Sequence, residues 1–497
     1  MKQFFIQLIF FVDNKNILKK NLLIKPWVCI FFIIIFQIPS VFLSAQSQFL
    51  SLGGLYGAGV KKLVVDSQGN SYLTGFMTEE IKLGEILLKE RDGKYFLTKI
   101  NKNSEIQWAK SLQVPIQDMA ILGDTNIILA GQFKESFNFD NQELTPKSNF
   151  DVFLLSLNEN GKLRWQQQIN GNSETLVKSI TTDKNGNIYI TGNFTGTTKF
   201  SKYILQPIHS KNIYIAKYNA QGEFDWVRQA SGGTNLLTGI HVWKIITHQS
   251  DHITIVGTIT GQANFGKKSL TSSHELFYGE GWVYNADIFA TQYSASGEVV
   301  WVKNMGTNAD VTDIATDKEN NIYLTGFIRG SQNLSNKPKF GLSIFGKVTI
   351  KINPTTSLQA LETVFFAKYS NAGNITWAKT IKGRGTSRGT KILYNHSTDN
   401  IWLCGFFKDI LKENENILRT ETQKSDIFLA LIDTNGKVQS LTQGQGEETE
   451  EVTDAFIDKN EELFIVGRFK KTLKIYDFLL QTDGNSTNGF WAKIKMK

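Results

Sequence analysis

From residue 48 onward, short runs alternate apolar and polar positions and are separated by turn residues. In the clearest run, residues 188–194, Ile-Tyr-Ile-Thr-Gly-Asn-Phe follows the turn sequence Asp-Lys-Asn-Gly-Asn. Alternation with a period of two predicts β-strands, and the Asp, Asn and Gly residues predict tight turns between them. One unit contains four such runs, at residues 179–183, 187–194, 212–218 and 224–229. The pattern predicts an all-β chain of antiparallel sheets.

This unit recurs through residues 48–497. Its clearest marker is a Thr-Gly step or a variant of it, whose glycine stands 56 to 79 residues from the next. The marker glycines are Gly75, Gly131, Gly192, Gly257, Gly326, Gly405 and Gly467. A second pattern, such as Asp426-Ile-Phe-Leu-Ala, follows the marker. A repeated four-strand unit of about 60 residues is typical of a propeller blade.

A third pattern places a glycine four residues before a tryptophan. Its copies are Gly161/Trp165, Gly222/Trp226, Gly297/Trp301 and Gly373/Trp377. Ser104 replaces the glycine before Trp108, and Ser440 stands where the sixth repeat should have its tryptophan. One tryptophan per unit on the outer strand predicts packing between neighbouring blades, rather than a ring of ligand-binding aromatics.

The two ends of the repeat region predict a closed ring. Residues 490–497 correspond to a third strand, and no fourth strand follows them. Residues 49–54, Phe-Leu-Ser-Leu-Gly-Gly, are similar to residues 226–233, which include the fourth strand of another unit. We therefore expect the N-terminal segment to complete the last blade, which would remove the open sheet edges.

Together these patterns resemble the bacterial seven-bladed β-propeller (SBBP) repeat family, with its D-x-x-G-N-x-Y-x-T-G-x-F, D-x-F-x-A-K and G-x-x-x-W steps. The resemblance covers nearly all of residues 48–497. It implies an all-β, seven-bladed propeller with four-stranded blades, in a secreted or cell-envelope protein, and it implies no reaction. The expected repeats are 54–113, 114–172, 173–233, 234–307, 308–385, 386–447, and 448–497 with 46–53.

Residues 1–45 predict a signal peptide. Three lysines within residues 19–25 precede the apolar run 27–36, and Ser44-Ala45 offers a cleavage site. The apolar run is shorter than the about 20 residues that a membrane span needs, so no stable span is expected after cleavage. A retained signal anchor and an over-extended start of the chain are the open alternatives. We expect a secreted or cell-envelope location.

Charge and cysteine content narrow the function classes. The net charge is +8, and residues 1–45 carry four of these charges, which leaves a mildly basic propeller. This is not the concentrated basic footprint of a nucleic-acid-binding protein. Cys404 is the one cysteine beyond the leader, so this part of the chain can form no internal disulfide. Its strand context predicts a small buried side chain.

Repeats four and five carry longer segments between their second and third strands. The segment from the marker glycine to the end of the third-strand pattern spans 24–26 residues elsewhere, but 35 after Gly257 and 42 after Gly326. These loops share one face with the links between blades, and loops on a rigid scaffold commonly carry function. The candidate ligand-binding residues of the fourth repeat are His274, Tyr278, Trp282 and Tyr284. Exposed Tyr and Trp would give rigid contact area, although such side chains could also fold back onto the blade. The fifth insertion predicts an extra hairpin.

No motif in the chain predicts a metal site or a cofactor. Four of the six histidines fall in the fourth repeat, but their spacing matches no metal-ligand pattern. The Asp-x-x-Gly-Asn turns lack the alternating carboxylates of a calcium loop. The acidic link 447–451 is expected to be a solvated loop.

These features predict a noncatalytic exported module that binds an extracellular or envelope protein or glycan on the face with the insertions. One alternative is a secreted hydrolase or lyase at the channel mouth, for which Asp310, Asp313 and Asp454 are the acidic candidates on first strands. The other alternative is a passive structural spacer.

Overall fold

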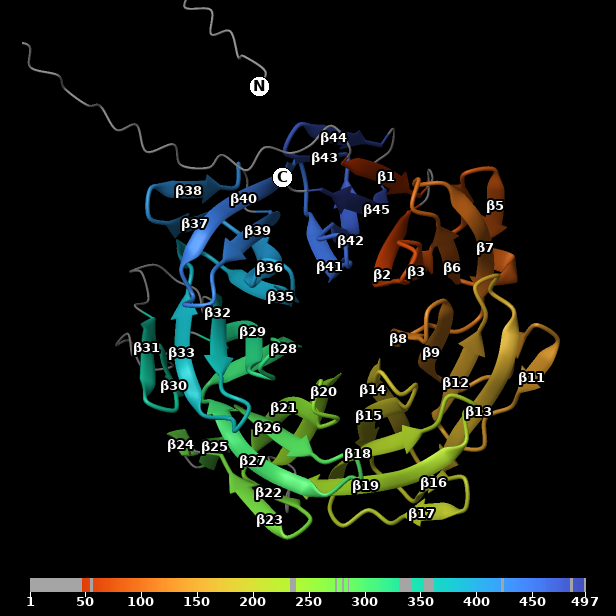
Figure 1. Ribbon diagram of the computed structural model, residues 1–497, viewed down its shortest axis with the longest axis vertical. Helices are drawn as coiled ribbons and strands as arrows, with labels where there is room; N and C mark the ends of the chain where they lie inside the picture. The colour runs from red at the N-terminus through yellow and green to blue at the C-terminus, as the bar shows by residue number, and fades with distance from the viewer. Residues whose placement is uncertain are drawn as a thin grey trace, which may run out of the picture. The chain divides into compact units, whose positions relative to one another are not determined.

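Each predicted four-strand unit folds into an antiparallel sheet in which the strand order follows the sequence. The computed structural model describes residues 47–495 except 54–56, 233–237, 273–274, 279–280, 285, 330–340, 353–361, 422–423 and 483–485. Residues 42–497 make up one compact unit. Figure 1 shows the first strand of each sheet innermost, around the centre of this unit. The protein is therefore an all-β propeller, and we name each blade by its innermost strand.

The strands of the blades follow the repeats closely. The β2 and β8 blades contain β2 (Ala58–Val65), β3 (Ser71–Met77), β6 (Tyr95–Ile100), β7 (Ile106–Leu112), β8 (Asp118–Leu122), β9 (Asn126–Phe133), β12 (Asp151–Leu157) and β13 (Leu163–Gly171). The β14 and β20 blades contain β14 (Thr175–Thr182), β15 (Ile188–Phe194), β18 (Lys211–Tyr218), β19 (Phe224–Gly232), β20 (Gly239–Thr247), β21 (Ile253–Thr260), β26 (Asp287–Tyr293) and β27 (Val299–Gly306). The β28 and β35 blades contain β28 (Ala309–Thr316), β29 (Ile322–Arg329), β32 (Glu362–Tyr369), β33 (Ile375–Thr380), β35 (Ser387–Asn395), β36 (Asn400–Phe407), β39 (Asp426–Ile432) and β40 (Val438–Gly446).

The last blade joins the two ends of the described chain. Its strands are β41 (Glu451–Ile457), β42 (Leu463–Lys470), β45 (Thr487–Ile494) and β1 (Gln48–Leu52). β1 pairs antiparallel with β45, with Gln48 opposite Lys493 and Leu52 opposite Gly489. The prediction that the N-terminal segment completes the last blade is confirmed.

Each repeat contains a short hairpin between its second and third strands, in addition to the four strands of the blade. These hairpins are β4 (Glu80–Leu83) with β5 (Ile86–Lys89), β10 (Phe137–Phe139) with β11 (Gln142–Leu144), β16 (Thr198–Phe200) with β17 (Tyr203–Leu205), β22 (Gln262–Phe265) with β23 (Lys268–Thr271), β30 (Gly341–Phe345) with β31 (Val348–Ile352), β37 (Ile410–Glu413) with β38 (Asn416–Arg419), and β43 (Thr472–Ile475) with β44 (Phe478–Gln481). Three of them extend the outer strand of the preceding blade, through the pairs β13–β16, β19–β22 and β40–β43. β37 pairs instead with the short strand β34 (Lys382–Arg384). The three hairpins that extend outer strands thus cover edges that would otherwise be open to other chains.

The extra hairpin predicted for the fifth repeat exists as β30–β31, but it corresponds to the hairpin that the other repeats also carry. The hairpin that has no counterpart lies in the fourth repeat, where β24 (Glu275–Tyr278) pairs with β25 (Gly281–Tyr284) in addition to β22–β23. Among the described residues there is no α-helix, only the 3-10 turn η1 (Glu90–Asp92), and no helix that could cross a membrane.

The hydrophobic core lies between adjacent blades. One cluster combines Tyr72 and Leu97 of the β2 blade with Ile127 and Phe153 of the β8 blade, all fully buried. Burial of apolar surface therefore stabilises each blade through its neighbours.

The marker glycines allow the first two strands of a blade to approach closely. A Cβ added at Gly192 would lie 1.8 Å from the carbonyl oxygen of Leu176 on the neighbouring strand β14. The same clash, at 1.8 to 2.1 Å, occurs at Gly75, Gly257, Gly326, Gly405 and Gly467. Only glycine fits where two backbones come this near.

The tryptophans join each blade to the next, as predicted. The indole nitrogens of Trp108, Trp165, Trp226, Trp301 and Trp377 donate hydrogen bonds of 3.0 to 3.2 Å to backbone oxygens in the next blade's turn between its third and fourth strands. The glycine of that turn lies against the ring, as Gly436 does against Trp377. The blade that follows Ser440 has no such turn, because β45 and β1 come from opposite ends of the chain. The missing tryptophan of the sixth repeat is therefore explained.

Candidate functional site

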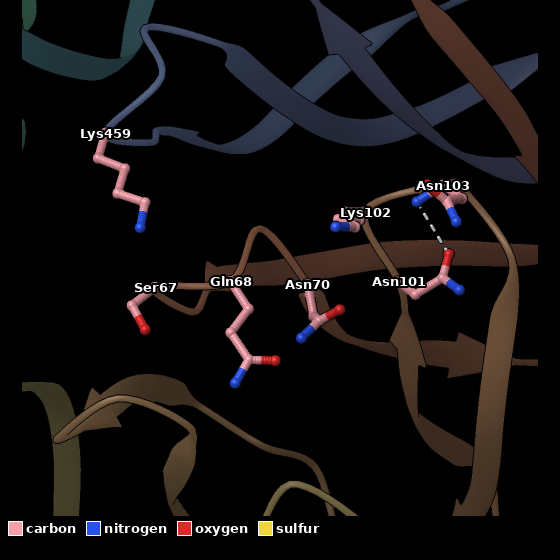
Figure 2. A pocket seen from close by; sticks show the side chains of 7 residues that line it. All are labelled: Ser67, Gln68, Asn70, Asn101, Lys102, Asn103 and Lys459. Atoms are coloured by element: carbon pink, nitrogen blue, oxygen red, sulfur yellow. Dashed lines mark hydrogen bonds between the residues drawn. The ribbon is translucent and has the colours of Figure 1, made fainter.

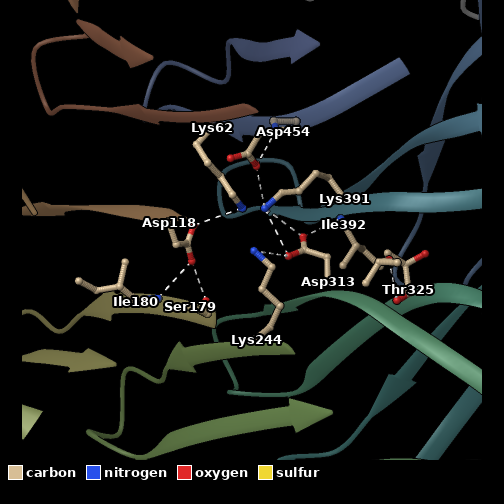
Figure 3. A network of polar contacts seen from close by, with 12 residues as sticks. Lys62, Asp118, Ser179, Ile180, Lys244, Asp313, Thr325, Lys391, Ile392 and Asp454 are labelled. Atoms are coloured by element: carbon tan, nitrogen blue, oxygen red, sulfur yellow. Dashed lines mark hydrogen bonds and ion pairs between the residues drawn. The ribbon is translucent and has the colours of Figure 1, made fainter. Parts of the chain in front are cut away.

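Each inner strand places one residue in a central network of polar side chains, which Figure 3 shows. The residues are Lys62, Asp118, Ser179, Lys244, Asp313, Lys391 and Asp454. All but Asp118 directly follow a β-bulge, where one strand carries an extra residue. The bulges help to direct these side chains between blades, because a bulge bends its strand and changes the direction of its side chains.

Opposite charges on successive blades pair in this network. Lys391 Nζ lies 3.2 Å from an oxygen of Asp313 on one side and 3.2 Å from an oxygen of Asp454 on the other. Lys62 lies 3.3 Å from Asp118. The aspartates are buried, and the lysine side chains are 15 to 19% exposed. The network therefore neutralises its own charges with little contribution from solvent.

The three aspartates also bind the backbone of the following blade. Asp118 accepts a hydrogen bond of 3.1 Å from the backbone N–H of Ile180. Asp313 accepts one of 3.0 Å from Ile392, and Asp454 accepts one of 3.1 Å from Leu63. Asp118 also accepts a bond of 2.8 Å from the Ser179 hydroxyl. These carboxylates therefore hold blades together.

The ion pairs favour the charged forms of Asp118 and Lys391. Burial alone would raise the pKa of Asp118, but Lys62 and Lys244 hold it far below its usual value. Burial likewise opposes the charge of Lys391, but Asp313 and Asp454 raise the pKa of Lys391 well above its usual value. A general acid or base must exchange protons near the working pH, and the shifts of Asp118 and Lys391 move both groups away from it.

Alignment of the repeats on their marker glycines could have found this network. Its residue stands thirteen positions before the marker glycine in most repeats, as Asp118 does before Gly131, and fourteen before Gly405. Within one repeat, each of these residues is an isolated polar side chain on a strand.

A separate pocket lies where the β41 blade meets the β2 blade, at the ends of the strands opposite the insertions. It has a volume of about 520 Å³, and Figure 2 shows its side chains. The lining residues are Ser67, Gln68, Asn70, Asn101, Lys102, Asn103 and Lys459. They come from the β2–β3, β6–β7 and β41–β42 turns. The pocket is polar and suits a small hydroxylated or anionic group.

Part of the repeat region matches a known protein family. Residues 164–196 match the family described as SBBP, the beta-propeller repeat. The chain carries an SBBP β-propeller repeat. The matched SBBP segment runs from β13 to just past β15, and it includes Trp165, Asp183 and Gly192.

Further comparisons give distant likenesses. An uncharacterised WD repeat-containing protein of Acanthamoeba polyphaga mimivirus is 23% identical over 456 residues, which cover 76% of this chain and 31% of that protein. This chain thus spans about a third of the length of that curated relative. Hydrazine synthase of Kuenenia stuttgartiensis is 8% identical, with 89% of this chain and 99% of that chain covered and a TM-score of 0.43. An ulvan lyase, a polysaccharide lyase, is 10% identical, with 88% and 97% covered and a TM-score of 0.44.

The aspartate of the SBBP turn organises the turn itself. Asp183 Oδ1 accepts the N–H groups of Asn185 and Asn187 at 2.9 Å, and Oδ2 accepts the Asn187 amide at 2.7 Å and the Tyr189 hydroxyl at 3.1 Å. Asp66 makes the same set of bonds beside the pocket. Both oxygens of each of these carboxylates therefore accept hydrogen bonds from groups in or beside their own turn. Within the described ranges, no group of three His, Cys, Asp or Glu residues could hold a metal.

The sequence-predicted ligand residues fall on the unmatched hairpin of the fourth repeat. Tyr278 ends β24, and Trp282 and Tyr284 lie on β25, where Trp282 pairs with Phe277. His274 lies outside the described residues. Because this hairpin and the 520 Å³ pocket lie at opposite ends of their blades, they cannot form one site.

The acidic candidates on the first strands have other partners. Asp313 and Asp454 belong to the central network, and Asp310 forms an ion pair of 2.5 Å with Arg329. Residues 385–389 read Gly-Thr-Ser-Arg-Gly, which has the spacing of a hydrolase nucleophile motif. Ser387 is buried at the start of β35 and accepts the N–H of Val364 at 3.0 Å, so it is a structural serine.

The prediction of a solvated acidic link is wrong for Glu450. This side chain is fully buried, and it faces the buried Asp426. Burial first and the negative charge of Asp426 second raise the pKa of Glu450 to about 8. Cys404 is buried, as predicted.

Proposed function

We propose that the protein is an exported, noncatalytic module that binds an extracellular or envelope protein or glycan. Residues 1–45 would direct its export, and the face with the β24–β25 hairpin would carry the ligand. The proposal includes no nucleic acid, no cofactor and no membrane span after cleavage.

The hairpin β24–β25 is the observation that carries this proposal. It is additional to the hairpin that the repeats share, and four of its eight strand residues are aromatic. Aromatic side chains are enriched where proteins hold their ligands, because they offer large rigid area at low entropic cost. The charged groups at the centre pair with one another and join blades. This favours a binding protein over an enzyme with a catalytic site at the centre.

We infer that the ring closes with seven blades. The innermost strands are β2, β8, β14, β20, β28, β35 and β41. The hydrogen bond from Leu63 to Asp454 links β2 directly to β41, which supports closure without a further blade. An experimental density map with another blade between β41 and β2 would contradict this count.

The binding proposal is tested with a glycan and envelope-protein screen of the full chain. One variant lacks residues 273–285, and a second carries Y278S, W282S and Y284S together. Both leave β22–β23 intact, whose Ala263 and Phe265 are buried. The matched control is Y203S, because Tyr203 is a 48% exposed aromatic on the common hairpin of the β14 blade. We expect ligand capture by the wild type and Y203S and its loss in both hairpin variants. Equal capture by all four proteins would overturn the assignment of this face.

Export is tested separately by expression in a bacterial host followed by fractionation. We expect the protein outside the cytoplasm with Gln46 as its first residue. An intact leader on protein in the cytoplasmic fraction would contradict the export proposal.

A further inference from the structure

On each inner strand except β8, a β-bulge adds one side chain beside the central network. These residues are Lys61, Lys178, Trp243, Thr312, Thr390 and Thr453. Thr312 donates a hydrogen bond of 2.7 Å to the carbonyl of Gly389 on the next blade, and Thr453 makes the equivalent bond at 2.8 Å. Lys61 and Trp243 are exposed. Thr312 and Thr453 thus join blades, whereas Lys61 and Trp243 present their side chains to solvent.

Trp243 lies within a group of basic side chains. The Lys178 ammonium is 5.5 Å from the centroid of the Trp243 ring. The ring of His241 stacks on it at a centroid distance of 6.3 Å and an interplanar angle of 23°. Trp243 remains 38% exposed despite these neighbours. An inner strand therefore offers an indole surface flanked by two nitrogen groups.

The charge of this group is not neutralised as in the central network. Burial lowers the pKa of Lys178, and no carboxylate of the described chain opposes that effect. Burial first, and then the charges of Lys211 and Lys178, lower the pKa of His241. Lys62, Lys244 and Lys391 by contrast each lie within 4.0 Å of an aspartate. An anionic ligand here would favour the charged form of Lys178 and so offset the effect of burial.

Among the described residues, the central network itself forms no ion pair between the inner strands β14 and β20, although Lys184–Asp251 and Arg228–Glu298 pair these blades further out. Ser179 donates to Asp118 of the preceding blade, and Lys244 pairs at 3.9 Å with Asp313 of the following blade. Lys178 and Trp243 are the bulge residues on the two sides of this junction.

We propose that Lys178, His241 and Trp243, with Lys211 beside them, bind an acidic polysaccharide. An indole packs against the apolar face of a pyranose ring, and lysines hold its carboxylate or sulfate groups through charge-assisted hydrogen bonds. This inference rests on the proposed binding function, and it names the ligand class and a site distinct from the β24–β25 hairpin.

The test measures binding of the full chain to alginate, a polymer of uronic acids, and to dextran as a neutral polymer of similar length. The variants are W243A, W243F and K178M, and the control is K199M, because Lys199 is exposed on β16. Thermal unfolding establishes that each variant is folded. We expect alginate but not dextran to bind, W243A and K178M each to weaken binding about tenfold or more, W243F less, and K199M not at all.

Three results would overturn the inference. The first is a wild type that does not bind alginate, and the second is alginate binding that W243A and K178M leave unchanged. The third is equal binding of poly-glutamate that W243A does not weaken, which would indicate an acidic peptide. If binding fails only in the variant lacking residues 273–285, the proposed function stands and this inference fails. If no protein or glycan binds the wild type in either screen, both fail.

Discussion

Asp454 on β41 accepts a hydrogen bond of 3.1 Å from the backbone N–H of Leu63 on β2, which lies 391 residues earlier in the chain. The same carboxylate lies 3.2 Å from the ammonium of Lys391 on the preceding blade. One side chain thus connects three consecutive blades at the place where the ring closes. Closure by β1–β45 pairing at the outer edge is therefore matched by a polar contact at the inner edge.

D454A should destabilise the protein strongly. It leaves the Leu63 N–H without its acceptor and removes one of the two carboxylates of Lys391, and breaking a buried ion pair costs about 3–5 kcal/mol. Urea denaturation measures the free energy of unfolding. The control is D225A, because Asp225 pairs with Lys217 at 3.0 Å but is 53% exposed, and such pairs contribute about 1 kcal/mol or less. Equal losses in the two variants would contradict the closing role of Asp454.

G222A should destabilise the joint between two blades. Gly222 has a φ of +79°, and a Cβ there would lie 2.7 Å from the Trp165 ring of the preceding blade. Strain and overpacking together cost about 1–3 kcal/mol. G266A is the control for strain alone, because Gly266 has a φ of +60° and no atom within 4 Å of an added Cβ. We expect W165A to reduce the cost of G222A in a double-mutant cycle, and additive costs would argue against this contact.

The pair Asp426–Glu450 should make stability decrease as pH rises. The pKa of Glu450 is raised from its ordinary 4.5 to about 8 in the folded protein, first by burial and then by Asp426. The folded state therefore binds more protons than the unfolded state between these values, and the stability present below about pH 4.5 is lost progressively up to about pH 8. Thermal unfolding from pH 5 to 8 measures this loss. E450Q should flatten the dependence, and E447Q, at a 58% exposed side chain, should not. A wild-type slope unchanged by E450Q would contradict the assignment.

The Cys404 thiol should report the opening of the ring. It is fully buried opposite Lys391, and burial raises the pKa of this thiol to about 12. Thiolates are the reactive form, so the native chain carrying C29S should not react with an aromatic disulfide reagent at pH 8. One thiol per chain should react after denaturation in urea. Rapid reaction of the native protein would show that the β35 blade is open to solvent.

Local patterns predicted the strands of the blades well, because alternation, turn residues and marker glycines are properties of neighbouring positions. Thr-Gly steps lie where two strands approach closely, and Asp183 caps its own turn through bonds within six residues. The tryptophans were interpreted correctly for a similar reason, since one per repeat on the outer strand already indicated blade-to-blade packing. The common hairpins could not be predicted in this way, because their strands of three to five residues are too short to show a clear period.

The sequence by itself determined the repeat, the antiparallel sheets and the strand that closes the last blade. Only the tertiary structure decided which charges meet. Lys391 stands 78 residues after Asp313 and 63 before Asp454 in the chain, and it lies 3.2 Å from an oxygen of each because successive inner strands converge on one centre. It also decided that Glu450 is buried, that Ser387 is structural, and that Trp243 is exposed beside Lys178. Each of these depends on contacts between blades, and a pattern confined to one repeat holds no information about the blade beside it.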